Sequence, residues 1–118
     1  MHQLMISVQQ KGAARFAVTV SGEIDLGTVR RLDDEVTPLT SAGARVALDC
    51  HGVAFMDSSG LKFLLRQSRL AKSSGGRLLL CAPSLPVIHV LELAEVTAVL
   101  DIRDDVQTAL DELPSQSE

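Results

Sequence analysis

The residues with the clearest chemical potential are two adjacent serines in the stretch Asp57-Ser58-Ser59-Gly60. An apolar segment ends near Asp49 and an amphipathic segment begins at Leu61, so the pattern predicts a strand that leads into a helix. At a helix N-terminus, Asp and Ser side chains accept hydrogen bonds from first-turn N–H groups, and negative charge is tolerated. The serine hydroxyls can therefore cap the helix, and they can also accept a phosphoryl group at that position.

A second chemistry open to Ser58 is nucleophilic catalysis, with His51 as the general base. The residues around Ser58 do not form the Gly-x-Ser-x-Gly turn of serine hydrolases, and the sequence defines no acidic partner for His51. The sequence therefore favours a modification or binding site over an enzyme, and we predict no catalytic residue.

The other candidate residues do not indicate a metal or cofactor site. Cys50 and Cys81 each end a predicted apolar strand, and neither belongs to a Cys-x-x-Cys or Cys/His ligand pattern. We therefore expect both to be buried, reduced thiols. His89 is alone in an apolar segment, and we expect it to be a packed or half-exposed side chain rather than a ligand.

Length and composition limit the class of protein. Of the 118 residues, 46% are hydrophobic and 22% charged, so we expect one soluble domain over residues 1–113 and a short polar tail at 114–118. A net charge of −4 and the absence of Trp and Tyr disfavour direct nucleic-acid binding. No apolar run reaches the roughly 18–20 residues that cross a bilayer, so we expect a cytoplasmic protein without membrane contact.

The segments that must position Ser58 alternate between strand and helix periodicity. A β-hairpin is followed by alternating helices and short apolar strands, which implies right-handed crossovers and parallel pairing in the middle of the sheet. Asp25 is the expected N-cap of the first helix. The predicted fold is α/β, with a mixed, mostly parallel sheet of four to five strands and about four helices. We predict strands at residues 4–10, 14–21, 45–50, 77–81 and 96–102, and helices at 26–40, 61–73, 84 to about 94, and 104 or 105 to 113.

Four short motifs lie at the ends of these elements. They are Gly22-Glu23-Ile24-Asp25, Phe55-Met56-Asp57-Ser58-Ser59-Gly60-Leu61, Gly75-Gly76 and Leu80-Cys81-Ala82-Pro83. The Asp-Ser-Ser-Gly-Leu sequence follows about 35 residues after Gly-Glu-Ile-Asp, at a predicted strand-to-helix junction. With these motifs the chain closely resembles the anti-sigma factor antagonists of the STAS domain family over nearly its whole length.

The resemblance implies a single-domain switch protein that regulates transcription, for example in a stress response. In such proteins the serine directly after the aspartate is phosphorylated by a partner that is both anti-sigma factor and GHKL-type serine kinase, which maps the phosphorylation site onto Ser58. The unphosphorylated form binds this partner and releases its sigma factor, phosphorylation weakens the binding, and a PP2C-type phosphatase reverses the modification. Asp57, Ser59 and Gly60 match the surrounding motif, and Asp25 matches an acidic position near the same surface.

The predicted second helix carries a basic stripe formed by Lys62, Arg66 and Arg69. At about 100° per residue, this stripe lies opposite Leu61 and Leu64. It can be an ordinary solvated face, or it can dock an acidic patch of the kinase with Phe63 as an apolar anchor. Lys62 also departs from the Gly-Leu-Gly sequence of many relatives, and its ammonium, four residues after Ser58, could reach a phosphate there.

Two further functions stay open within the same resemblance. The chain could be a STAS subunit of a sensory complex, or a regulatory domain that binds a small ligand such as a nucleotide. A regulatory fragment related to anion transporters is disfavoured because no membrane segment is predicted.

Overall fold

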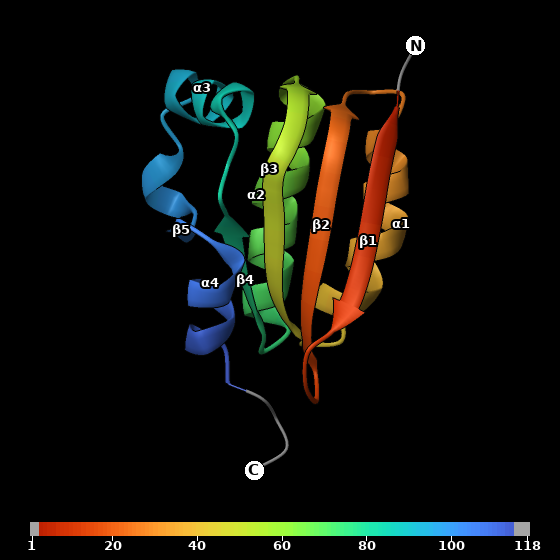
Figure 1. Cartoon of the computed structure of the whole chain (residues 1–118), viewed down its shortest axis with the longest axis vertical. Coiled ribbons are helices and arrows are strands. Elements are labelled where there is room, and N and C mark those ends of the chain that lie inside the picture. Colours follow the sequence, from red (N-terminus) through yellow and green to blue (C-terminus); the bar gives the residue numbers. More distant parts are fainter. Residues whose placement is uncertain (1–2, 115–118) are drawn as a thin grey trace.

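A computed structural model describes residues 3–114, which form a five-stranded sheet with strand order β1-β2-β3-β4-β5 (Figure 1). The predicted α/β class, with four α-helices in the described residues, is confirmed. In chain order the elements are β1 (Leu4–Gln10), β2 (Arg15–Ile24), α1 (Val29–Thr40), β3 (Arg45–Met56), α2 (Ser58–Ser73), β4 (Arg77–Cys81), α3 (Leu85–Leu93), a 3-10 turn η1 (Thr97–Val99), β5 (Ile102–Arg103) and α4 (Val106–Glu112).

The sheet is mixed, as the sequence predicts. β1 and β2 form an antiparallel hairpin, and β2, β3, β4 and β5 pair in parallel with their neighbours. The hairpin turn contains Gly12 and Ala14 at positive φ, and Lys11 donates its N–H to the Arg15 carbonyl across a distance of 2.7 Å. Parallel pairing places the carboxyl ends of β2 and β3 at the same end of the molecule, where Asp25 and Asp57 follow.

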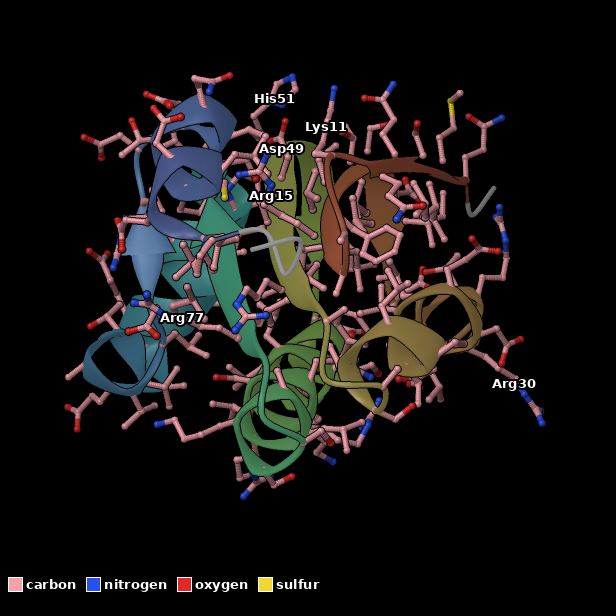
Figure 2. All side chains as sticks on the ribbon, turned by 90° about the horizontal axis from the view of Figure 1, so that it is seen from below. Lys11, Arg15, Arg30, Asp49, His51 and Arg77 are labelled. Atoms are coloured by element: carbon pink, nitrogen blue, oxygen red, sulfur yellow. The ribbon has the colours of Figure 1, made fainter. Side chains whose placement is uncertain are left out.

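Helices α1 and α2 cover one face of the sheet, and α4 lies against the other face over β3 and β4 (Figures 1 and 2). The main core lies between the sheet and the α1–α2 layer. Burying a side chain such as leucine contributes roughly 1.5–3 kcal/mol, so this layer is the main source of stability. Its fully buried side chains include Val18, Val20, Leu32, Leu48, Phe63 and Leu64, and a smaller cluster of Ala47, Leu79, Cys81, Ala109, Leu110 and Leu113 lies under α4.

β3 extends to Met56, whereas the sequence predicts that it ends at Cys50. The pair His51-Gly52 resembles a break in the strand pattern, but Val53 and Met56 beyond it are buried and continue the core. Gly52 fits there because a Cβ atom would lie 2.8 Å from the Ser21 Cβ of the adjacent strand. The pairing of β2 with β3 is irregular in this region, which shifts the side-chain alternation that the sequence pattern relies on.

Other predicted elements also differ at their ends. β2 runs to Ile24 and not to residue 21, and α2 begins at Ser58 and not at residue 61. The first helix begins at Val29, so Leu26 is not part of its apolar face and is 80% exposed. The predicted strand at 96–102 is mostly wrong, because η1 occupies its first half and β5 has only two residues. Asp105, and not Asp104, is the N-cap of α4 and accepts a hydrogen bond from the Thr108 N–H. Ser84 is the N-cap residue of α3, but its buried hydroxyl makes no cap bond within residues 3–114.

Both cysteines are buried and unpaired by disulfide, which confirms the prediction. Burial raises the pKa of the Cys50 thiol far above its ordinary value, and it raises the pKa of Cys81 to about 12, with the Asp49 charge adding to each effect. These thiols are therefore protonated and unreactive in the folded chain. Of the predicted tail, residues 115–118 lie outside the described part. Among the described helices, none is long and apolar enough to cross a membrane.

Candidate functional site

The candidate site lies at the carboxyl ends of β2 and β3, where α2 begins. Ile24 and Met56 are register partners at the last step of the two strands, and the Asp57 N–H donates to the Ile24 carbonyl at 3.1 Å. This bond fixes the start of α2 against β2. The turns after the two strands therefore lie side by side, as parallel pairing requires.

Asp57 is the N-cap of α2. Its backbone is extended, and its carboxylate oxygen Oδ1 accepts the Ser59 N–H at 2.8 Å. Such a cap contributes roughly 0.5–2 kcal/mol to helix stability. Ser58, the first residue of the helix, is exposed, and Ser59 is half-buried. The helix is capped by the aspartate, so the Ser58 hydroxyl is not needed for capping and faces solvent.

Asp25 holds the turn between β2 and α1. Its carboxylate oxygen Oδ1 accepts the N–H groups of Gly27 at 2.9 Å and Thr28 at 3.1 Å, and only 7% of the residue is exposed. The prediction that Asp25 is the N-cap of α1 is wrong, because Thr28 occupies that position. Asp25 instead caps the turn before it. A contact between Asp25 and a partner stays a prediction.

Gly60 faces the core rather than solvent. A Cβ atom on it would lie 2.4 Å from the Met56 Cγ and 2.9 Å from the Ile24 Cγ2, well inside normal contact distance. The glycine therefore allows the first turn of α2 to pack directly on the ends of β2 and β3. A contact between Gly60 and a partner stays a prediction.

Two exposed apolar side chains flank the site and are missing from the sequence prediction. Leu26 is 80% exposed in the turn after β2, and Phe55 is 49% exposed near the end of β3. Phe55 is the register partner of Glu23, two residues before Asp25. A sequence signal was present, since Leu26 directly follows the motif that ends at Asp25 and Phe55 is the first residue of the motif that contains Ser58. We call Leu26, Phe55, Asp57 and Ser58 the Ser58 surface.

Two residues of the predicted partner-binding face of α2 lie differently in the structure. Phe63 is completely buried, so the expectation that it anchors a partner at the surface is wrong. Arg66 forms an ion pair with Asp33 of α1, which ties this part of the stripe to the protein itself. Lys62 is exposed and forms no ion pair within residues 3–114, while Arg69 lines a shallow hollow of about 270 Å³ with Leu65, Ser68 and Val99.

The reason for the error at Phe63 is the residue at the centre of the buried arc. That arc contains Gly60, Phe63, Leu64, Gln67 and Ala71, and its middle is occupied by a polar side chain. Gln67 accepts a hydrogen bond from the Thr40 hydroxyl at 2.6 Å and donates to the Thr37 hydroxyl at 2.8 Å. The amide thereby joins α2 to α1 and holds the helix that carries Ser58 in place.

His51 does have an acidic partner, contrary to the sequence prediction. Its Nδ1 lies 2.8 Å from the Asp49 Oδ1. Asp49 is buried, whereas the imidazole is largely exposed. The pair nevertheless lies within β3, and five strand steps to Met56 span roughly 16 Å at about 3.3 Å each. A general base must lie within hydrogen-bond reach of the hydroxyl, so His51 does not activate Ser58.

Comparison with known proteins bears on this geometry. The family model of the STAS domain matches residues 5–109. The chain is 32% identical over 99 residues to an anti-sigma F factor antagonist of Paenibacillus polymyxa, covering 81% of this chain and 84% of that protein. The chain belongs to the STAS domain family of anti-sigma factor antagonists. It is also 29% identical to the anti-sigma-B factor antagonist of Bacillus subtilis (strain 168), over 72% of this chain and 78% of that protein.

Solved structures agree on the STAS fold. An anti-sigma factor antagonist from Mycobacterium paratuberculosis matches with a TM-score of 0.82 at 20% identity, over 94% of each chain. Unphosphorylated SpoIIAA matches with a TM-score of 0.77 at 21% identity, over 92% of this chain and 95% of that chain. The phosphorylated form of SpoIIAA from Bacillus matches with a TM-score of 0.73 at 20% identity, over 92% of this chain and 98% of that chain.

Proposed function

We propose that this STAS domain is an anti-sigma factor antagonist that works by partner switching, with Ser58 as its phosphorylation site. Its partners would be an anti-sigma factor that is also a GHKL-type serine kinase, and a PP2C-type phosphatase that restores the unmodified serine. The observation that carries the proposal is that Asp57, and not Ser58, caps the start of α2. Asp57 caps the helix and leaves the exposed Ser58 hydroxyl available for modification.

Phosphorylation at this position would change the surface without unfolding the domain. A phosphoryl group adds about −1.5 to −2 charge, and the N-terminus of the 16-residue helix α2 favours negative charge. Asp57 lies next to it, so negative charge becomes concentrated on the Ser58 surface. The domain would remain folded, and the altered electrostatics would be felt mainly by the partner.

The apolar side chains around the serine explain why a partner would respond strongly. Leu26 and Phe55 expose area that a partner can bury, and a partner that covers the Ser58 surface removes water from the hydroxyl as well. An unmodified hydroxyl is desolvated at modest cost, whereas a dianionic phosphate in the same apolar contact costs much more unless cations pair with it. Phosphorylation would therefore weaken an interface that uses these two side chains.

Lys62 would stabilise the phosphorylated state. It is exposed, has no ion pair within residues 3–114, and lies four residues after Ser58 on the same side of α2. A lysine at this spacing can pair with a phosphate through a charge-assisted hydrogen bond. We expect Lys62→Ala to change the rate of phosphorylation or dephosphorylation, with Lys62→Arg as the control that keeps the charge. Equal kinase and phosphatase kinetics for Lys62→Ala and the parent would contradict this role.

The first test of the switch is incubation with ATP and candidate anti-sigma kinases, followed by mass spectrometry of the intact chain. One phosphate should appear on the parent and on Ser59→Ala, and none on Ser58→Ala. Ser58→Asp should bind the kinase more weakly than Ser58→Ala in a calorimetric titration. A phosphate that persists on Ser58→Ala would move the site, and equal binding by the two variants would contradict the switch.

A further inference from the structure

The outer edge of the sheet formed by β1 is unprotected. β1 has seven residues, Leu-Met-Ile-Ser-Val-Gln-Gln, and contains no charge and no proline. Its pairing with β2 is regular along the whole strand, and within residues 3–114 no further strand pairs with its outer side (Figure 1). Sheet proteins normally protect a long edge with charges, proline, bulges or a covering element, because free N–H and C=O groups otherwise recruit another strand.

The hydrogen bonds at both ends of the hairpin identify which groups are free. The Gln3 carbonyl accepts the Glu23 N–H, and the Lys11 N–H donates to the Arg15 carbonyl, each at 2.7 Å. Residues bonded to one neighbour alternate along an antiparallel strand, so the odd-numbered residues of β1 bond to β2. The backbone groups of the four even-numbered residues therefore point outward, namely those of Leu4, Ile6, Val8 and Gln10.

We propose that this edge binds a second copy of the chain, with the two β1 strands antiparallel about a two-fold axis at Ser7. In this register Leu4 pairs with Gln10 of the other copy and Ile6 pairs with Val8. The four outward-facing residues of one copy then form N–H···O=C hydrogen bonds with the same four residues of the other copy. This register gives the largest overlap that the strand allows. The arrangement is independent of the proposed phosphorylation.

A second copy fits this edge better than a charged peptide does. Each Ile6–Val8 pair joins two apolar side chains on the same face, and Val8 is 38% exposed in the isolated chain. No like charges meet, because β1 carries none. Beside Ile6, a shallow hollow is lined by Arg31, Asp34 and Glu35 of α1, so each copy brings both signs of charge to the rim. A two-fold axis can place one sign against the other.

The dimer leaves the candidate site open. The Ser58 surface is at the ends of β2 and β3, and β3 lies two strands from the edge, or about 10 Å at the usual strand spacing. The dimer therefore presents two Ser58 surfaces on one continuous sheet. A single edge buries less area than stable interfaces usually need, so the association should be reversible and concentration-dependent.

Cysteine cross-linking tests the register. Ser7 lies on the axis as a non-hydrogen-bonded pair, in which Cα atoms are about 4.5 Å apart, within the range of a disulfide. Ser7→Cys should form a covalent dimer under mild oxidation. Met5→Cys is the matched control on the same face, because its two copies would be roughly 14 Å apart along the strands. The parent chain controls for Cys50 and Cys81. A Ser7→Cys chain that cross-links no more than Met5→Cys would overturn the proposal.

Sedimentation of the unmodified full chain tests the association itself, from about 10 µM to about 1 mM. The parent should shift from monomer toward dimer as its concentration rises. Val8→Pro removes an outward N–H that β2 does not use, so it should remain folded and monomeric. Val8→Lys is a second blocking variant, and Val8→Thr should still dimerise. A parent that stays monomeric, or a dimer that persists in a folded Val8→Pro or Val8→Lys chain, would overturn the proposal.

Discussion

The role of Phe63 can be tested directly, because the sequence pattern assigns it to a docking surface and the structure places it in the core. Its side chain is fully buried in the core between α2 and the sheet. Replacing a buried phenylalanine with alanine costs about 3–5 kcal/mol through lost apolar transfer and the remaining cavity. A domain of this size typically has about 6–18 kcal/mol of stability, at roughly 0.05–0.15 kcal/mol per residue. Phe63→Ala should therefore remove a large fraction of the total.

Urea unfolding followed by circular dichroism measures the effect. With a slope of about 2 kcal/mol per molar urea, a loss of about 4 kcal/mol lowers the midpoint by about 2 M. Lys62→Ala is the matched control on the adjacent, exposed position and should stay within about 0.5 kcal/mol of the parent. If Phe63→Ala retained the parent's midpoint while losing affinity for the kinase, Phe63 would be a docking residue and the core assignment would be refuted.

Three further predictions follow from individual contacts. Gly60→Ala should destabilise the domain by about 1–3 kcal/mol through overpacking against Met56 and Ile24, although alanine normally stabilises a helix; an unchanged thermal midpoint would contradict this. The pKa of Asp105 is lowered because its carboxylate accepts hydrogen bonds from Thr108, chiefly from the backbone N–H. The contribution of this carboxylate to folding stability is therefore complete above the ordinary pKa of 3.8, and it is lost as the pH falls through the lower pKa of the folded state. Asp105→Asn keeps a capping side chain but should show a weaker loss of stability on acidification from about pH 5 to pH 3, measured by urea midpoints. Cys50 and Cys81 should react with a thiol reagent slowly in the native chain and rapidly in urea, since burial raises the pKa of both thiols; fast native labelling would show that the site opens.

Elements with strong local periodicity could be predicted from the sequence. The hairpin, the cores of the four helices, β4 and the first half of β3 all lie where the spacing of apolar residues places them. The capping residues before α2 were also predictable, because an N-cap is a local interaction between Asp57 and the next two residues, although the helix begins at Ser58 and not at residue 61 as predicted. The exposure of Ser58 at this position follows from the same local geometry.

Several features of the candidate site depended on contacts between distant segments. The helical wheel of α2 gives the angles between side chains but does not say which direction faces the sheet. Gly60 and Gln67 lie in the middle of the buried arc and neither counts as apolar, so the apolar pattern alone is centred away from Phe63. Gln67 can be buried there because Thr37 and Thr40 of α1 form hydrogen bonds with its amide.

The sequence by itself determined the order and type of most elements and the capped helix start at Ser58, because these depend on interactions within a few residues. The tertiary structure decided that Gly60 and Phe63 face inward, that Leu26 and Phe55 are exposed, and that β1 forms an open edge. Each of these properties requires knowing which segment lies against which. The physical reason is that burial belongs to a pair of surfaces, and a single segment's pattern describes only one of them.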